Sequence, residues 1–348
     1  MNDELRKWAR RGRHAILDGL RAAGTFRLIA KSAWRRRRLL ILCYHGVSLR
    51  DEHEWNGRLF VTPAFLRRRL EILRDGGYAV LPLDGAVKSL RLGTLAPRSV
   101  VLTFDDGFHN FHAAAAPLLE EFGYPATNYM SSYYCVRQHP IPTITLRFLL
   151  WRARSKIVAP GVLPGQGGPV DLRDARQRET LASALLERVH GGGQDAQSAL
   201  LVEVAARLGI DLDAILSDRL FHLMTPAEAG DITRRGFDLQ LHTHRHRTPR
   251  EKPAFCDEVL ENRRILREMT GRRATHFCYP SGDVDPAFLP WLRELEVETA
   301  TTTRVAGLAN AGHDPLLLPR FVDTMEQPEV VFESWLCGAG AAMSRRGR

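Results

Sequence analysis

The sequence predicts an α/β fold in which parallel strands and helices form a barrel, with a helical insertion in one connection. Two observations support this prediction. Eight short apolar runs of strand length occur between residues 39 and 322, and segments with helix start and stop signals separate most of them. Alternating strands and helices over about 300 residues are typical of a parallel sheet, and eight strands favour a barrel over an open sheet.

The expected strands are apolar throughout, as strands of a parallel sheet covered by helices usually are. Thr62 and Pro63 predict the start of one intervening helix and Gly76 its end, and Gly271 predicts the end of another. The eight expected strands are residues 39–44, 78–83, 99–104, 125–130, 237–241, 275–279, 299–303 and 316–322.

The alternation of strands and helices is interrupted once, by a segment rich in Gly and Pro that also holds two helical stretches near residues 174–189 and 194–208. This insertion either caps the functional site or only decorates the barrel. The predicted organisation is a basic helical leader at residues 1–38, a barrel at 39–337 with an inserted helical subdomain at 138–220, and a basic tail at 338–348.

The net charge of +9 belongs to the leader. The chain holds 49 basic residues (Lys and Arg) and 40 acidic residues (Asp and Glu). Residues 1–38 hold twelve of the basic residues and three of the acidic ones, so the remaining residues hold 37 basic and 37 acidic residues. The main domain therefore gives no reason to expect a nucleic-acid partner. The leader either lies on an anionic membrane surface or packs as a partly ordered tail on the domain.

The sequence predicts a cytoplasmic protein, with peripheral membrane contact through residues 1–38 as an open alternative. No apolar run approaches the roughly 18 residues of a membrane span, and no apolar segment of about 7–15 residues follows the basic start as in a signal peptide. The five cysteines are an odd number without CxxC spacing, which is typical of reduced thiols rather than of a disulfide framework.

Two adjacent carboxylates follow the third expected strand, in the stretch "VVLTFDDG" that ends with Asp105, Asp106 and Gly107. Because like charges repel, a structural turn would normally use one Asp or Asn, and a cation or another partner should compensate the pair. One carboxylate could bind a metal ion while the other stays free near the attacking water as general base.

Two imidazoles follow the fifth expected strand, in "HTHRH" at residues 242–246. His242 and His246 share one face in either a helical or an extended segment, so both can meet one ion. Two His and one carboxylate form a known set of zinc ligands, and one of the paired Asp residues would complete it. The loops that follow the strands of a barrel build one face, so His45, Tyr279, Ser281 and Arg320, also at strand ends, should converge there.

These motifs resemble those of the polysaccharide deacetylases, the NodB-homology group of carbohydrate esterase family four. "TFDDG" at 103–107 matches the first motif of that family and "HTHRH" matches the second, whereas "CYPSG" at 278–282 and "LPRF" at 318–321 resemble later motifs. "LCYHGV" at 42–47 resembles members related to poly-N-acetylglucosamine deacetylases. The resemblance covers residues 39–337 apart from the insertion.

The resemblance implies a distorted barrel of seven or eight β/α units and a divalent metal ion, most often zinc, held by Asp106, His242 and His246. It implies that Asp105 is the general base, that Thr243 supports the second motif, and that N–H groups near Tyr279 and Ser281 stabilise the oxyanion. The expected reaction is hydrolysis of acetyl groups on an N-acetylated saccharide.

Two positions depart from the family pattern. Cys278 stands where an Arg often orients the catalytic Asp, and Arg320 is the expected substitute. The histidine that usually serves as general acid is not evident, and the candidates are His244, His276 and His313. His45, Tyr133 and Tyr134 are expected contacts for the sugar, since aromatic rings stack on sugar rings. Two other interpretations stay open: a catalytically impaired glycan-binding or assembly protein, and an amidohydrolase that acts on a non-sugar substrate.

Overall fold

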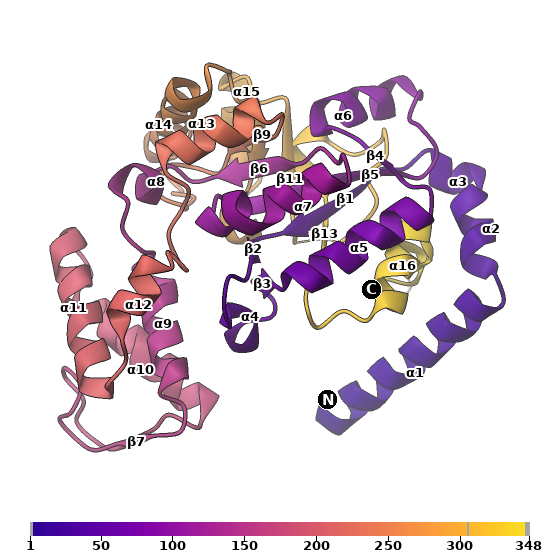
Figure 1. The fold of residues 1–348 in the computed structure, drawn as a ribbon. Coiled ribbons are helices and arrows are strands. Elements are labelled where there is room, and N and C mark those ends of the chain that lie inside the picture. Colours follow the sequence, from indigo (N-terminus) through magenta and orange to yellow (C-terminus); the bar gives the residue numbers. More distant parts are fainter. Residues whose placement is uncertain (1–2, 305, 345–348) are drawn as a thin grey trace.

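A parallel sheet that curves into a nearly closed barrel forms the centre of the protein (Figure 1). The computed structural model describes residues 3–304 and 306–344, and the side chains of residues 12–304 and 306–343. The strands lie in the order β12-β11-β10-β9-β6-β5-β1-β13, all pairs are parallel, and β4 pairs with β5. The strands are β1 (Leu40–Tyr44), β4 (Ala79–Val80), β5 (Ser99–Asp106), β6 (Thr127–Met130), β9 (Asp238–Leu241), β10 (His276–Cys278), β11 (Thr299–Thr302), β12 (Leu318–Pro319) and β13 (Phe321–Val322).

Each of the eight expected strands is present, and the last one closes the barrel. The expected run at 316–322 forms β12 and β13, which are separated by Arg320. The first piece pairs with β11 and the second pairs with β1, so the same run of chain joins both edges of the sheet. The predicted barrel of seven or eight β/α units with a helical insertion is confirmed.

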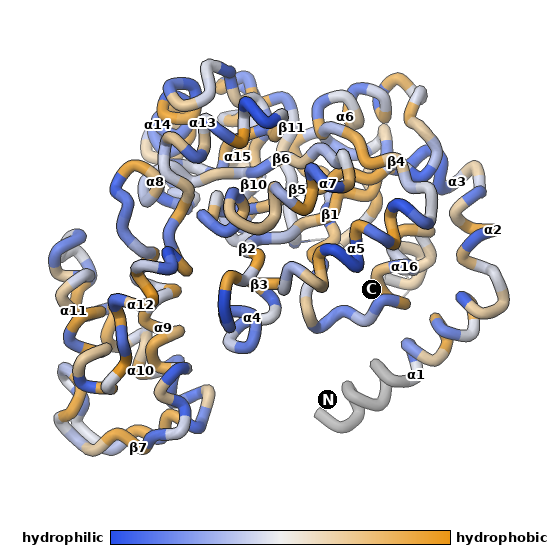
Figure 2. The backbone as a smooth tube through the Cα atoms, viewed as in Figure 1, coloured by the Kyte–Doolittle hydropathy of each residue, from blue (hydrophilic) through white to orange (hydrophobic). Residues whose placement is uncertain are grey.

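The helices that cover the outside of the barrel pack their apolar faces on the strands. In α5, Leu66, Leu70 and Leu73 are buried, and Figure 2 shows hydrophobic and hydrophilic stretches alternating along this helix. The covering helices are α5 (Pro63–Asp75), α6 (Leu83–Leu92), α7 (Ala116–Glu121, preceded by a π-helical turn at Phe111–Ala115), α13 (Pro226–Arg234), α14 (Lys252–Thr270), α15 (Phe288–Glu294) and α16 (Glu329–Cys337).

The interior of the barrel is filled by side chains at alternate strand positions. Leu39, Ile41, Val101, Tyr129 and Cys278 form one buried cluster, to which α6 contributes at the amino-terminal ends of the strands. By this alternation Cys43, Thr103 and Asp105 also face inward, toward the carboxyl-terminal ends. Short elements surround that end of the barrel: β2 (Gly46–Val47), β3 (Phe60–Val61), α4 (Glu52–Trp55), α8 (Tyr133–Arg137) and the 3₁₀ turn Pro280–Gly282.

The insertion forms a small helical lobe beside the barrel (Figure 1). Both expected helices are present, and a short antiparallel strand pair that the sequence did not predict lies before them. Buried leucines hold the lobe together, among them Leu149, Leu185 and Leu201. Its elements are α9 (Pro142–Arg152), β7 (Ile157–Val158), β8 (Val170–Asp171), α10 (Ala175–Arg188), α11 (Gly193–Leu208) and α12 (Leu212–Ser217).

The leader is helical and packs on α16. It comprises α1 (Asp3–Ala22), α2 (Thr25–Lys31) and α3 (Ala33–Arg36), and Leu17 and Phe26 are buried where α1 and α2 contact α16. Arg35 is buried as well; its Nε and Nη2 donate to the carbonyl oxygens of Leu336 and Ser99 at 2.8 and 3.1 Å. The leader thus contacts the domain through part of its surface, and Arg35, one of the four consecutive arginines at residues 35–38, is a structural residue.

The expected basic tail at 338–348 is helical from Ala339 to Ser344, which is α17. Ala339 and Ala341 are buried in its contact with α16, and residues 345–348 lie outside the described part of the chain. Within residues 3–304 and 306–344, the helices are either too short or too polar to cross a membrane.

Candidate active site

A cavity of about 490 Å³ opens at the carboxyl-terminal ends of the strands and brings most of the predicted site residues together. It lies between the loops that follow β1, β5, β6, β9, β10 and β11, which is where a barrel positions functional side chains. The predicted residues that line it are His45, Asp105, Asp106, Tyr134, His242, His246, Tyr279, Ser281 and Arg320. Residues as distant in sequence as His45 and Arg320 therefore share one site.

Asp105 is buried and is held by Arg320. Both carboxylate oxygens accept hydrogen bonds from the guanidinium, Oδ1 from Nη1 at 2.7 Å and Oδ2 from Nη2 at 2.6 Å. Burial on its own would raise the pKa of Asp105, but the charge and hydrogen bonds of Arg320 outweigh burial and lower the pKa to about 2. Asp105 is therefore an ionised, oriented acceptor for a proton.

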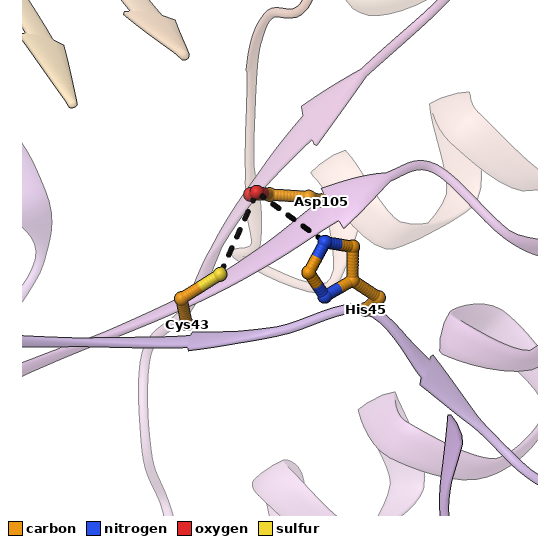
Figure 3. A group of neighbouring side chains, drawn as sticks. All are labelled: Cys43, His45 and Asp105. Carbon is orange, nitrogen blue, oxygen red and sulfur yellow. Dashed lines mark hydrogen bonds and ion pairs between the residues drawn. The ribbon is translucent and has the colours of Figure 1, made fainter. Parts of the chain in front are cut away.

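Two thiols and an imidazole complete the surroundings of Asp105. The Sγ atoms of Cys43 and Cys278 each lie 3.5 Å from Oδ2, and His45 Nε2 lies 3.9 Å from the same oxygen. Figure 3 shows Cys43 and His45 directed at the carboxylate from the end of β1. Arg320 Nη2 also donates to Cys278 Sγ at 3.0 Å. The small Cys278 thus leaves room for the guanidinium that arrives from the last strand.

Asp106 faces the same cavity because the backbone leaves the regular strand at this residue. Consecutive side chains of a strand point to opposite faces, so Asp105 and Asp106 would normally diverge. Asp106 has φ 74° and Gly107 has φ 88°, both in the left-handed region. A Cβ at Gly107 would lie 2.4 Å from Cγ of Met130, so no larger residue fits here without a shift. Positive φ at a non-glycine residue is a form of strain that persists mostly at functional sites.

His242 and His246 converge on Asp106. Their Nε2 atoms lie 3.2 and 3.1 Å from Asp106 Oδ1, and the three ligand atoms all lie within 4.8 Å of one another. His242 Nδ1 lies 2.9 Å from the carbonyl oxygen of Cys278. That oxygen can only accept, so Nδ1 carries the proton and Nε2 presents its lone pair to the site. Burial would raise the pKa of Asp106, but His246 and His242 lower it well below its usual range.

This donor set fits a divalent metal ion. Two imidazole nitrogens and one carboxylate oxygen are ligands that zinc takes in catalytic sites, and a backbone carbonyl that fixes the tautomer of one imidazole is a common support. Asp105 is not a member of this set, and each of its oxygens accepts a hydrogen bond from Arg320. The two carboxylates thus have different partners although they are adjacent in sequence.

The loop that carries the two histidines is fixed by buried polar contacts. Thr243 is fully buried with φ 59°, and its Oγ1 accepts the N–H of Arg247 at 3.0 Å. Asn262 Oδ1 accepts the N–H of His242 at 2.9 Å, and both carboxylate oxygens of buried Glu258 accept donors from the loop. The supporting position expected for Thr243 agrees with these contacts.

Tyr279 and Ser281 border the cavity in different ways. The Tyr279 hydroxyl donates to the carbonyl of Leu316 at 3.0 Å, and its N–H donates to Thr301 in the sheet at 3.3 Å. This N–H is therefore already engaged, and the Tyr279 side chain is buried against Phe277. Ser281 has φ 57° in the turn that follows. Within the described residues its N–H has no acceptor, so it is the better candidate oxyanion donor.

The structure separates the two tyrosines that were expected to contact the sugar. Tyr134 lines the cavity, whereas Tyr133 lines a neighbouring surface groove, where its ring packs edge-on against His244 with centroids 5.5 Å apart. The expectation for Tyr133 at this cavity is therefore corrected: consecutive residues of α8 point about 100° apart, so only one can face the site.

None of the three histidines considered as general acid lines the cavity. His244 Nδ1 pairs with the hydroxyl of Ser132 at 2.9 Å, and His276 lies at the amino-terminal end of β10 against Thr299. His313 Nδ1 accepts a backbone N–H within its own loop at 3.0 Å. Of the histidines in the described part of the chain, three line the cavity: His45, His242 and His246. His45 is the one that does not belong to the candidate metal-ligand set.

Sequence reasoning missed one wall of the cavity. Ile141, Thr143 and Ile144, at the start of α9, belong to the insertion and line the site. The signal was weak, since these residues carry no reactive group and the segment lacks a motif. The insertion therefore contributes directly to the cavity and is more than a decoration of the barrel.

Comparison with known proteins agrees with this geometry. The family model of the polysaccharide deacetylases matches residues 93–166 and 193–300, more than half of the chain. The poly-beta-1,6-N-acetyl-D-glucosamine N-deacetylase of Escherichia coli (strain K12) is 31% identical over 100 residues, which are 28% of this chain and 15% of that protein. The matched segment is thus a small part of the relative's length.

Solved structures share the fold. The Streptococcus pyogenes deacetylase PplD, in complex with acetate, superposes with a TM-score of 0.56 at 18% identity, over 85% of this chain and 97% of that one. IcaB from Ammonifex degensii superposes with a TM-score of 0.53 at 16% identity, over 87% and 97%. With the family model covering both the Asp pair and the histidine loop, the chain belongs to the polysaccharide deacetylase family.

Proposed function

We propose that this protein is a metal-dependent deacetylase that removes acetyl groups from the amino sugars of an N-acetylated saccharide. The observation that carries the proposal is the division of the Asp pair in one cavity: Asp106 with two imidazoles, and Asp105 with a guanidinium. The first group is a set of metal ligands and the second is an oriented base. Metal-assisted hydrolysis of an amide uses both.

Asp106, His242 and His246 would hold the ion. When bound, a divalent ion such as zinc polarises the acetyl carbonyl and lowers the pKa of water. Asp105 accepts the proton of the attacking water while Arg320 keeps its carboxylate ionised and oriented. The N–H of Ser281 faces the cavity, where it can donate to the carbonyl oxygen as that oxygen gains charge.

The proton for the leaving nitrogen comes from His45 in this proposal. Water adds to the acetyl carbon, the carbon–nitrogen bond breaks, and the amine leaves with a proton while acetate is released. His45 lines the cavity beside Asp105, and its Nδ1 is buried without a partner in the described structure. His45 thereby replaces the three histidines that lie elsewhere.

The first substrate to test is an oligomer of N-acetylglucosamine. The Escherichia coli relative is named for that polymer, and the partly exposed Tyr134 lines the cavity as an aromatic side chain of the kind that sugars pack against. Acetate release should require added zinc or cobalt and should stop when a chelator is present. Full activity in the chelator would contradict the proposed chemistry.

The same experiment distinguishes the two other interpretations. Saccharide binding with one metal ion per chain and no acetate release would favour a binding or assembly protein. Release of acetate or ammonia from simple amides, with none from saccharides, would favour a non-sugar amidohydrolase. The complete set of Asp105, Asp106, His242 and His246 favours a hydrolase over the binding protein.

We also propose that the leader contacts an anionic membrane surface. Ile16 on α1 and Leu28 on α2 are 61% and 72% exposed, and the exposed cations Arg13, Arg27 and Lys31 lie near them in the sequence. Exposed aliphatic residues among cations are typical of interfacial helices. Leu28→Asp should weaken sedimentation with phosphatidylglycerol vesicles. Leu92→Asp, at a position of α6 that is 77% exposed, is the matched control. Equal effects of the two changes would contradict the proposal.

A further inference from the structure

A second group of metal-ligand atoms lies next to the first one. Cys43 Sγ, a ring nitrogen of His45 and a carboxylate oxygen of Asp105 all lie within 4.8 Å of one another. Figure 3 shows the thiol and the imidazole approaching the carboxylate from one side. The group shares no residue with Asp106, His242 and His246. It therefore has its own capacity for an ion.

Two distances in this group are close to the separation of two ligands on a tetrahedral ion. With metal–ligand bonds of about 2.0–2.3 Å, two tetrahedral ligands are about 3.3–3.7 Å apart. Cys43 Sγ lies 3.5 Å and His45 Nε2 lies 3.9 Å from Asp105 Oδ2. Small rotations of the side chains would bring all three atoms to bonding distance, and the cavity beside His45 leaves the fourth position to water.

We infer that Cys43, His45 and Asp105 form a second cation site, which is inhibitory and selective for thiophilic divalent ions such as zinc in excess or cadmium. A thiolate, an imidazole and a carboxylate select soft and borderline ions over magnesium or calcium. An ion at this site removes the lone pair of Asp105 that would accept a proton from water. It also occupies His45, so turnover stops while the first site stays filled.

The second site should fill after the first. Arg320 lies against Asp105 and repels a further cation, and the Cys43 thiol must lose its proton to the solvent before it binds. Burial raises the pKa of this thiol, which adds to the cost of binding. The first site has neither obstacle. Activity should therefore rise with the first equivalent of metal and fall with further metal.

Cadmium reports on the sulfur directly, since a cadmium–thiolate bond absorbs in the ultraviolet and a site of oxygen and nitrogen does not. The metal-free full chain is titrated with cadmium alone, and absorbance and bound metal are measured. The expected result is a first equivalent without the thiolate band and a second equivalent with it. Cys43→Ser should abolish the band and keep the first equivalent, which also verifies that the variant is folded.

Two matched changes decide which thiol is responsible. Cys256→Ser, at a half-buried position on α14, should leave the band unchanged. Cys278 lies the same 3.5 Å from Asp105 Oδ2 and groups with His242. Loss of the band in Cys278→Ser but not in Cys43→Ser would overturn the assignment. So would a wild-type chain that binds one cadmium ion without a thiolate band. If Cys43→Ser fails to fold, Cys43→Ala carries the same test.

Discussion

Asp105 and Asp106 are neighbours in sequence, yet they lie in opposite surroundings. Asp105 is bound by a guanidinium and flanked by two thiols inside the barrel, whereas Asp106 is approached by two imidazoles at the rim. In both cases burial would raise the pKa of the carboxyl and the partners lower it. The comparison teaches that the partner, more than the degree of burial, assigns each carboxylate its role.

The largest expected effects come from removing the charge of each carboxylate in turn. Asp105→Asn should keep metal binding and lower kcat by about 10³-fold, because general bases contribute about 10²–10⁴. Asp106→Asn should instead lose the metal, because an amide replaces the charged ligand. Acetate release and bound metal, measured on both variants, check this. Loss of metal from the Asp105 variant would break the proposed division between the two residues.

Removal of Arg320 tests the Asp105 side of the comparison. Arg320→Gln leaves a buried carboxylate without its counter-charge, which should lower the free energy of unfolding by about 3–5 kcal/mol. The double variant Asp105→Asn/Arg320→Gln should recover part of this loss, since neither charge of this pair remains. Urea denaturation measures both values. If the destabilisation of the double variant equals the sum of the destabilisations caused by Asp105→Asn and Arg320→Gln alone, the two side chains do not interact directly.

The turn formed by Asp106 and Gly107 depends on the glycine. Gly107→Ala adds a Cβ at φ 88°, 2.4 Å from Cγ of Met130, and should cost about 2 kcal/mol of stability. Because this turn directs Asp106 away from the normal strand alternation, metal affinity should fall as well. Gly85→Ala on α6, where nothing lies within 4 Å, is the control. Unchanged metal affinity would show that the turn does not position Asp106.

The smallest expected effect concerns Glu228, a carboxylate outside the cavity that contacts both a guanidinium and an imidazole. Glu228 lies 2.6 Å from Arg219 Nη1 and 3.1 Å from His109 Nδ1. Burial would raise the pKa of Glu228, but His109 and Arg219 lower it below the ordinary value of 4.5. Its stabilising contribution is therefore complete above pH 4.5 and is lost as the pH falls below that value.

Glu228→Gln should accordingly be less stable than the wild type by about 1–2 kcal/mol at pH 7, and by less at pH 3. Thermal unfolding at both pH values measures this difference. Asp75→Asn, an exposed carboxylate next to Arg74, is the control and should change stability little at either pH. A Glu228→Gln difference that grows toward pH 3 would contradict the direction of the shift.

Much of the fold and part of the site could be predicted from the sequence, since they depend on local patterns. Apolar runs and helix boundaries give the strands, and the spacing of the Asp pair and of His242 and His246 gives a ligand set. Such patterns need no knowledge of which strands are neighbours. The sequence also offered Arg320 as a substitute for the arginine missing at Cys278, but its contact with Asp105 depends on how the barrel closes.

The rest of the site depends on contacts between distant segments. Cys43 and Cys278 lie in segments that resemble family motifs, but those motifs give their thiols no role, and the thiols meet Asp105 only because β1, β5 and β10 face the same interior. The sequence does not distinguish Tyr133 from Tyr134, whereas in the structure α8 directs Tyr134 to the cavity and Tyr133 to a neighbouring groove. The wall from the insertion follows from the packing of α9 near the site, which composition does not reveal.

Arg320 lies where β12 ends and β13 begins, so the residue that holds the Asp105 carboxylate also joins the two edges of the sheet. Asp105 can therefore acquire its charged partner only when the final strand has docked on both sides. A folding intermediate with an open barrel would present the proposed ligands Asp106, His242 and His246 without an oriented Asp105 carboxylate beside them. Catalytic competence would then be a late checkpoint of folding, reached in the same step that completes the barrel.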